Sequence, residues 1–447
     1  MDALAALREA AGEVIETSLC DVQGNWLALV NTQEGKRLAF AAKGEAALSA
    51  QWKDVEKEAD VKDVHVSVMA LNANNAALVR RYVKWTAPTA CGTKGASIGF
   101  SDWLGEADAV VAELFGKRQL KPVLVDFTTE DSEALQRYFV QAVDTATWGV
   151  LEEGYKEGYG ANAAGLKTEE EIVKALLYGY SMIGFDCSDK IDLGIEKLSD
   201  EAVDQRFEQF NETFRAAVHA SYLNAEFKVG TSKITFTENQ LHRIVLEYGE
   251  AIMHIQFIYN SYLKNTPWDI DFELDLSKPG KVLTPQEHYL IGNELQRNGI
   301  KLSSICLDPL KDAEAVNDNL QLHCEIADTF GYRLSFKNAD IAMEDTAAAM
   351  KYLKGKVHFK MNNILWMSAI ELAKALDADL FGKLCAACGC EPTADAADRA
   401  LVLGYRKALN PKEEGNVAAD MKAFLEAHHA EYAAAIKENV AAKLKNI

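Results

Sequence analysis

Carboxylates, amides and lysines follow a series of short apolar runs, and side chains of these types can do chemistry. Carboxylates can move protons, and lysines can bind anionic groups. Exposed loops also contain such residues, so the pattern alone is a mild functional signal. In chain order the residues are Asp126, Thr128, Asp186, Ser188, Asp189, Glu273, Asp275, Asp308, Lys337, Asn338, Asp340, Lys360, Asn362 and Asn363.

Two of the carboxylates are candidates for catalysis. Glu273 lies inside the alternating segment DIDFELDL (269–276), whose inward positions would face the interior of the fold. A buried carboxylate needs a charged partner or a raised pKa, so we expect one of these for Glu273. Asp189 follows the apolar run YSMIGFD and could be a general base or a helix cap.

Six further residues are candidates for substrate contact. Lys337 and Lys360 end consecutive apolar runs and could form a positive pocket for a carboxylate or phosphate, although solvated loop lysines would look the same. His288, in TPQEHYL, could be a ligand or an acid/base, although a hydrogen-bonded helix residue is the commoner case. The six are Asp102, Ser188, His288, Lys337, Asn338 and Lys360.

Motifs for metals and cofactors are weak. The cluster Cys385-x-x-Cys388-x-Cys390 follows a helical stretch, and no second cysteine or histidine pair nearby completes a tetrahedral set. We interpret it as small apolar residues at a helix end, so residue spacing alone predicts no metal ligand. The Gly-x-Gly-x-x-Gly fingerprint does not follow the first strand, which argues against an open doubly wound sheet.

The elements that must position these residues are eight apolar runs, most of them followed by a helical pattern. Apolar strands that alternate with helices are typical of a parallel sheet covered by helices. Eight of them favour an α/β fold with a closed (β/α)8 TIM-type barrel, in which chemistry is located at the carboxyl ends of the strands. The runs are 96–100, 122–127, 180–186, 268–276, 302–308, 332–336, 356–360 and 400–405.

Two regions are expected along the chain. Alternating segments such as NWLALVN and VHVSVMALN predict an N-terminal α+β cap over residues 1–90. Residues 91–447 would form the barrel, with a long helical insertion at about 190–266 and further helices at the C-terminus.

Composition excludes some classes of function. A formal net charge of −20 argues against nucleic acid and anionic membrane surfaces as partners. The N-terminus lacks the basic segment of a signal peptide, and no apolar run is long enough to span a membrane. Eight scattered cysteines suggest reduced thiols and therefore a cytoplasmic location. The oligomeric state is left open.

Long blocks of the sequence, in order, resemble the tagaturonate epimerase family. The resemblance implies an isomerase of hexuronate metabolism that interconverts keto-sugar acids of the tagaturonate and fructuronate type. It further implies a divalent metal ion, no nicotinamide cofactor, and a small sugar acid or ketose as partner. The blocks are 145–163, 180–189, 247–259, 269–276, 284–302, 323–336 and 357–360.

Some departures from the family pattern fall at the ends of the strands. Lys190 and Lys337 stand where the family carries histidine, and an ammonium group cannot ligate a cation. The expected metal-ligand set therefore looks incomplete. Either a metal or a lysine would assist a retro-aldol reaction, with Glu273 or Asp189 moving the proton. The alternative is a non-catalytic paralogue that binds a sugar or a protein partner.

Overall fold

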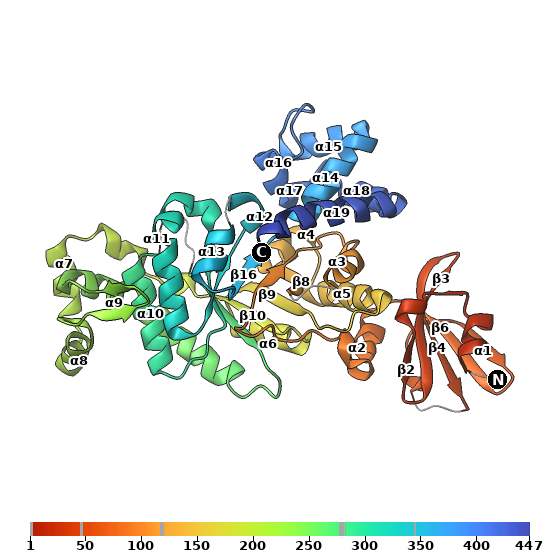
Figure 1. Ribbon diagram of the computed structural model, residues 1–447, viewed down its shortest axis with the longest axis horizontal. Helices are drawn as coiled ribbons and strands as arrows, with labels where there is room; N and C mark the ends of the chain where they lie inside the picture. The colour runs from red at the N-terminus through yellow and green to blue at the C-terminus, as the bar shows by residue number, and fades with distance from the viewer. Residues whose placement is uncertain (1–2, 45–47, 117–119, 277–280, 282, 344–345) are drawn as a thin grey trace.

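Eight parallel strands close into a barrel in the computed structural model, which describes residues 3–44, 48–116, 120–276, 281, 283–343 and 346–447. Around the barrel the order is β10-β13-β14-β15-β16-β7-β8-β9 (Figure 1). Seven of the eight neighbouring pairs are consecutive barrel strands in the chain, with an insertion between β10 and β13, and the eighth pair, β16–β7, closes the barrel. The predicted (β/α)8 TIM-type fold is thus confirmed. The strands are β7 (Ser97–Gly99), β8 (Lys121–Thr128), β9 (Gly160–Leu166), β10 (Met182–Asp186), β13 (Asp271–Asp275), β14 (Ser304–Leu307), β15 (Arg333–Phe336) and β16 (Val357–Lys360).

One predicted strand was wrong and one strand was missed. The run 400–405 lies in the short helices α16 (Arg399–Leu403) and α17 (Tyr405–Ala408), because a short apolar run fits a buried helix as well as a strand. The missing strand is β9, whose sequence GANAAGL contains no β-branched or aromatic residue. Close packing selects small residues there: a Cβ on Gly160 would lie 2.9 Å from Cγ2 of Val123.

Most of the barrel helices follow the strands that they cover. They begin at capping residues such as Thr168 and Thr284, each of which accepts a hydrogen bond from the backbone N–H three residues later. The helices are α3 (Asp108–Phe115), α4 (Thr129–Leu135), α5 (Phe139–Glu153), α6 (Glu169–Leu177), α10 (Pro285–Arg297), α11 (Pro309–Phe330), α12 (Ala339–Ala342) and α13 (Thr346–Tyr352).

The N-terminal residues form a separate antiparallel sheet at one end of the molecule (Figure 1). Its strands are β1 (Glu13–Val14), β2 (Cys20–Val22), β3 (Asn25–Thr32), β4 (Gly35–Lys43), β5 (Val55–Val61) and β6 (Val64–Met69), and α1 (Ala3–Ala10) contacts β3, β4, β5 and β6. The next helix, α2 (Ala73–Tyr82), joins this sheet to the barrel because Arg80 pairs with Asp144 of α5 at 2.8 Å.

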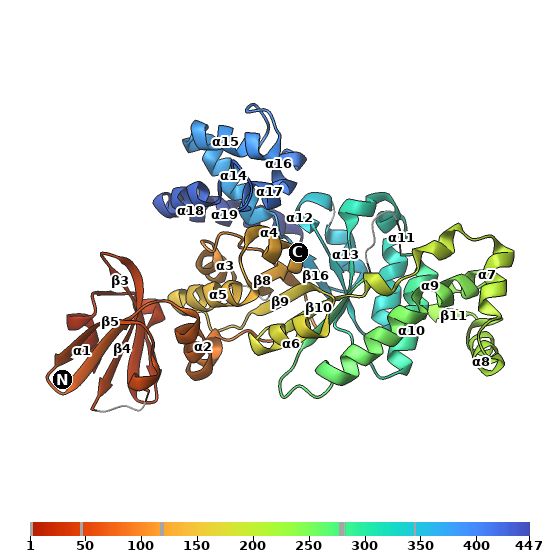
Figure 2. The same ribbon diagram turned by 180° about the vertical axis from the view of Figure 1, so that it is seen from behind.

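The insertion between β10 and β13 extends at the end opposite the N-terminal sheet (Figure 2). It contains the helices α7 (Asp200–Phe207), α8 (Glu212–Tyr222) and α9 (Glu238–Ile258). It also contains a small hairpin of β11 (Phe227–Val229) and β12 (Ser232–Ile234), which the expectation of a purely helical insertion did not include. The insertion thus carries its own small group of packed elements beside the barrel.

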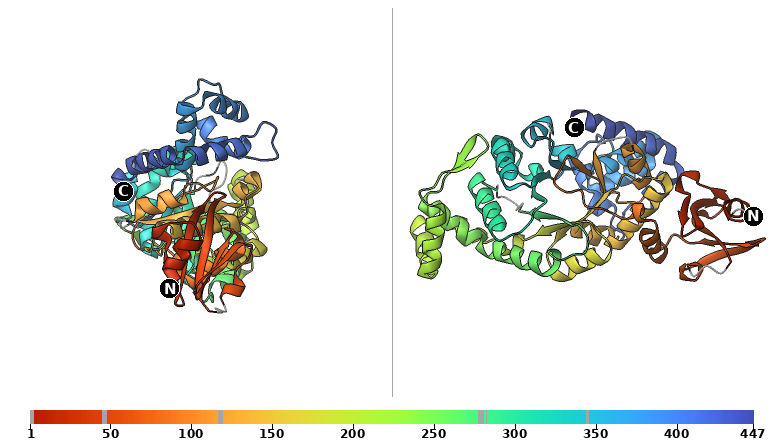
Figure 3. Two further views of the ribbon diagram at one scale, coloured as in Figure 1. Left: turned by 90° about the vertical axis from the view of Figure 1, so that its right-hand side faces the viewer. Right: turned by 60° about the horizontal axis from the view of Figure 1, so that its bottom comes forward.

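The C-terminal helices stand together above the barrel (Figure 3). Besides α16 and α17 they are α14 (Ile364–Leu376), α15 (Ala378–Cys388), α18 (Ala418–Ala427) and α19 (His429–Lys443). Across the described residues, every helix is too short or too polar to cross a lipid bilayer.

Candidate active site

A buried ion pair crosses the interior of the barrel. The Lys360 ammonium on β16 lies 2.5 Å from Oε1 of Glu273 on β13, and these two strands are not neighbours in the barrel order. Ser304 donates to the other Glu273 oxygen at 2.9 Å. Both charged side chains are only 2% exposed. Lys360 is therefore the charged partner that the sequence led us to expect for Glu273.

The second neighbour of Lys360 is Asp126 on β8. Its Oδ1 lies 3.6 Å from the Lys360 ammonium and accepts a hydrogen bond from Asn162 at 2.8 Å. Its Oδ2 is buried and has no hydrogen-bond partner among the described residues. Gly99 leaves room for this carboxylate, since a Cβ there would lie 2.8 Å from Oδ2.

The three groups shift one another's pKa values. Burial raises the pKa of Glu273, but the charges of Lys360 and His358 and the hydrogen bonds to the carboxylate together hold it below its usual value. Burial likewise raises the pKa of Asp126, where Lys360 opposes the effect without cancelling it. Burial lowers the pKa of Lys360, yet its two carboxylate neighbours raise it well above normal. Lys360 and Glu273 therefore both carry charge at neutral pH.

A cavity of about 740 Å³ opens above this buried group, at the carboxyl ends of the strands. Lys360 and Asp126 line it, whereas Glu273 lies beneath Lys360 and is 1% exposed. Polar residues after several other strands also line it. Of the eight residues predicted from sequence, the structure brings five to this cavity, namely Ser188, Asp189, Lys337, Asn338 and Lys360.

Lys337 and Asn338 form one side of the cavity. The Lys337 ammonium is paired with Asp275, which together with other neighbours raises its pKa although burial lowers it. Asn338 has φ of 50°, a left-handed conformation that asparagine tolerates better than most residues. Its amide donates to Asp308 at 3.2 Å, and its carbonyl oxygen accepts from Asn363 at 3.2 Å.

Asp189 lies at the other side of the cavity, where its side chain is 68% exposed. Lys167, directly after β9, lies 2.9 Å from Asp189 and 3.6 Å from Asp186. The neighbouring Lys190 is exposed and pairs with Glu250 of α9 at 2.8 Å, and it does not line the cavity. Of Lys190 and Lys337, only Lys337 therefore faces the site.

Two predicted site residues are placed elsewhere. The Asp102 carboxylate accepts the backbone N–H groups of Gly105 and Ala107 at 2.8 and 2.6 Å, so it shapes the loop before α3. His288 is fully buried outside the barrel, where its ring nitrogens contact His323 at 2.9 Å and the Tyr332 hydroxyl at 2.8 Å. Asp102 and His288 therefore do not line the cavity at the barrel mouth.

The structure adds residues that the sequence reading did not select. Asp126 carried a signal, a single carboxylate inside the apolar run PVLVDF, but it was not chosen over other strand-end residues. Lys167 was missed because β9 itself was missed. A further wall comes from α17, where Tyr405 stacks on Trp103 with ring centroids 3.4 Å apart and donates to Asp131. Nothing in the sequence pattern places α17 beside α4.

Among the described residues, the donors at the barrel mouth do not form a close group of three potential metal ligands. Within the described ranges, one group of three His, Cys, Asp or Glu side chains has ligand atoms within 4.8 Å of one another, and it lies in the insertion. At the mouth, Lys337 and Lys360 neutralise the carboxylates of Asp275 and Glu273. The divalent metal that the family resemblance implies therefore stays a prediction.

Comparison with known proteins matches most of the chain to one family. The model of the tagaturonate epimerase family matches residues 15–431. The tagaturonate/fructuronate epimerase of Thermotoga maritima is 27% identical over 383 residues, which cover 83% of this chain and 78% of that protein. A glycerol-complexed crystal structure of the fructuronate–tagaturonate epimerase from Cohnella laeviribosi superposes with a TM-score of 0.85 at 24% identity, covering 98% of this chain and 96% of that one. The native structure of the same Cohnella enzyme matches equally well, with a TM-score of 0.85, 24% identity, and coverage of 98% and 97%. The chain belongs to the tagaturonate epimerase family.

Proposed function

We propose that this chain interconverts keto-sugar acids of the tagaturonate and fructuronate type in the cavity at the barrel mouth. One observation supports this most directly: a buried ammonium, Lys360, borders the cavity between the carboxylates of Asp126 and Glu273. The family match and the name of the Thermotoga relative supply the substrate class.

The cavity attracts an anionic substrate only near its few cationic side chains. The lining contains more carboxylates than cations, in a chain whose formal charge is already −20. A sugar acid would therefore need local positive partners for its carboxylate. Lys167, Lys337 and Arg406 line the cavity, and we assign the binding of the substrate carboxylate to this set.

The reaction that fits these groups is a retro-aldol cleavage followed by re-addition. The inverted carbon carries a hydroxyl β to the ketone, and its own C–H bond is not acidic. A carboxylate takes the hydroxyl proton, the adjacent carbon–carbon bond breaks, and the electron pair moves onto the ketone oxygen. The aldehyde fragment then rotates, the bond re-forms on the other face, and the proton returns.

Asp126 and Lys360 take the two central roles in this scheme. Asp126 lines the cavity, and burial raises its pKa, which suits a group that must accept and return a proton. Lys360 would stabilise the negative charge that develops on the ketone oxygen. Its raised pKa favours the ammonium form, so an electrostatic role is preferred over imine formation. Asp189 is a second proton acceptor on the opposite side.

Product analysis of the purified protein tests the proposal. Incubation with either tagaturonate or fructuronate should yield the other, with and without added divalent metal in separate arms. In D2O the retro-aldol route leaves the inverted carbon free of deuterium, so label there would contradict it. Lys360→Met should lower turnover by about 100- to 1000-fold, whereas Lys383→Met, at a surface lysine paired with Asp420, should leave it unchanged.

Two outcomes would count against the proposal. Failure to interconvert the two acids in every metal arm would favour the non-catalytic alternative, for which calorimetric binding of the same acids is the next measurement. A borohydride-trapped imine on Lys360 would replace the electrostatic role with a covalent one.

A further inference from the structure

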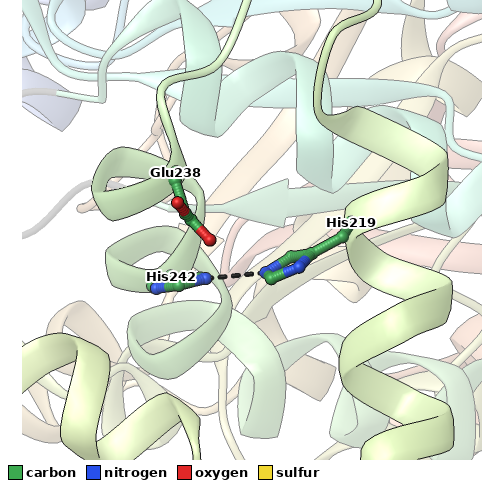
Figure 4. A group of neighbouring side chains, drawn as sticks. All are labelled: His219, Glu238 and His242. Carbon is green, nitrogen blue, oxygen red and sulfur yellow. Dashed lines mark hydrogen bonds between the residues drawn. The ribbon is translucent and has the colours of Figure 1, made fainter.

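Two histidines of the insertion face each other across a pair of helices. Nε2 of His219 on α8 lies 2.8 Å from Nε2 of His242 on α9. Glu238, one turn before His242 on the same helix, directs its carboxylate towards them (Figure 4). One potential ligand atom from each of the three residues lies within 4.8 Å of the others. These three residues do not line the cavity at the barrel mouth.

The hydrogen-bond network fixes the orientation of the His242 ring. Asp204 of α7 approaches His242 Nδ1 at 2.7 Å, so this nitrogen donates its proton to the carboxylate. The lone pair of His242 Nε2 then faces His219. Asn239 holds Asp204 in turn at 3.1 Å, and Phe207 stacks on the His242 ring with centroids 3.8 Å apart.

This arrangement matches how proteins prepare a metal ligand. A ligating histidine usually donates its second ring N–H to a carboxylate, which sets its tautomer and increases its basicity. Two histidine nitrogens and one carboxylate are a common three-residue set for zinc, with water at the fourth position. Glu238 is exposed and His219 is half-buried, so an ion and its water can reach the site.

We propose that His219, Glu238 and His242 bind a divalent transition-metal ion with the chemistry of Zn²⁺, and that Asp204 orients His242. Tetrahedral geometry with Zn–N bonds of roughly 2.05 Å needs the two nitrogens roughly 3.3 Å apart, so the present 2.8 Å must widen only slightly. The ion links α8 to α9 and, through Asp204, to α7. Its role is to hold the insertion together, outside the reaction itself.

A second histidine pair in the same protein shows that a close histidine contact alone does not make such a site. His288 and His323 also meet through ring nitrogens, at 2.9 Å. There the other nitrogen of His288 contacts the Tyr332 hydroxyl, and both histidines are almost fully buried. No carboxylate joins that pair in a group of ligand atoms within the described residues. Only the pair in the insertion combines a third ligand, an orienting carboxylate and access to solvent.

Zinc binding to the full chain, without a histidine tag and after chelator treatment, tests the proposal. Calorimetric titration with Zn²⁺ should find one equivalent that His219→Gln/His242→Gln removes and that the surface variant His429→Gln keeps. Asp204→Asn should weaken this equivalent by about 10–100-fold. Zn²⁺ should also raise the thermal midpoint of the parent chain but not that of the double variant.

Three controls make the result decisive. The exposed variant Glu238→Gln should weaken the same equivalent, which keeps the test valid if the double variant folds poorly. Asp126→Asn should retain it, so an ion at the barrel mouth would be distinguished. The double variant should keep the parent's epimerisation rate. Equal Zn²⁺ binding by the parent chain, by the double variant His219→Gln/His242→Gln and by Glu238→Gln would overturn the proposal.

Discussion

Replacement of Lys360 by methionine tests whether one buried charge serves both the stability and the chemistry of the barrel. The ammonium lies 2.5 Å from Glu273 and 3.6 Å from Asp126, and the three side chains are at most 2% exposed. Methionine has a similar length and no charge. The variant therefore leaves two carboxylates buried without a cation between them.

The expected loss of stability follows from this burial. Removal of one partner of a buried ion pair typically costs about 3–5 kcal/mol, because the remaining charge has lost both water and its partner. We expect Lys360→Met to lose about this much at pH 7.5. The double variant Lys360→Met/Glu273→Gln should recover a large part of the loss, because the glutamine is neutral and can still accept the Ser304 hydrogen bond.

The pH dependence gives an independent check. In the parent chain the folded-state pKa of Glu273 is lowered, so the stability from its pair is present at neutral pH and is lost as pH falls through that pKa. In Lys360→Met the pKa of the buried Glu273 should instead rise. Its penalty is then full at high pH and shrinks as the pH falls towards the unfolded value of about 4. The difference in unfolding free energy between the parent and Lys360→Met should therefore be smaller at pH 5 than at pH 7.5.

Urea unfolding at pH 7.5 and pH 5 measures these differences, and the epimerisation rate is measured on the same samples. Loss of a charge that stabilises a developing oxyanion typically lowers kcat by about 100- to 1000-fold. A loss of less than about 1 kcal/mol at pH 7.5 would refute the reasoning, since this is what an exposed ion pair contributes. An unchanged rate would refute the catalytic assignment alone.

Three further predictions follow from other residues. Asp126→Asn should lower kcat by about 100-fold or more while the unfolding midpoint stays constant or rises, because the amide is neutral; epimerisation assays and thermal unfolding measure this. Asn338→Ala should cost about 1 kcal/mol more than Asn338→Gly in urea unfolding, because both variants lose the side-chain hydrogen bonds and glycine adopts φ of 50° without strain; equal costs would contradict the backbone argument. Burial lowers the pKa of His288 well below normal and that of His323 to about 4. The unfolded chain therefore binds more protons below pH 6.5, and the free energy of unfolding should fall as the pH drops from 6.5 to 4. Urea unfolding at a series of pH values measures this dependence on pH, which His323→Gln should reduce.

The sequence was sufficient for the fold class and for choosing five of the residues that line the cavity, for a physical reason. Apolar strands that alternate with amphipathic helices have few ways to bury their surface, and carboxyl ends of parallel barrel strands meet at one mouth. Lys337 and Lys360 could therefore be placed together although they lie 23 positions apart in the chain. The strand β9 was missed because close packing, rather than strand propensity, selects its glycines and alanines.

Side-chain partners explain why Asp102 and His288 lie away from the cavity. Nothing in the local pattern distinguishes Asp102, which binds the backbone of its own loop, from a strand-end residue that faces the cavity. His288 meets His323 from a helix 35 residues later, a contact that only the packed structure supplies. Long-range partners decide the role of a polar residue, and spacing along the chain does not report them.

The same principle explains how two lysines, Lys337 and Lys360, can stand at the barrel mouth. A buried lysine at the barrel mouth is destabilising unless acidic neighbours stabilise its charge. Both lysines have such neighbours: Asp275 pairs with Lys337, and Asp126 and Glu273 lie beside Lys360. The inner carboxylates thus stabilise a fixed positive charge at the floor of the cavity. A fixed ammonium stabilises a developing oxyanion without any reorganisation. In other enzymes a Lewis-acidic metal ion can perform this electrostatic task. In this arrangement Glu273 acts on the reaction only through the Lys360 ammonium. Glu273→Gln should then lower kcat and shift the lower limb of its pH profile, while substitution at Asp126 removes the proton acceptor itself.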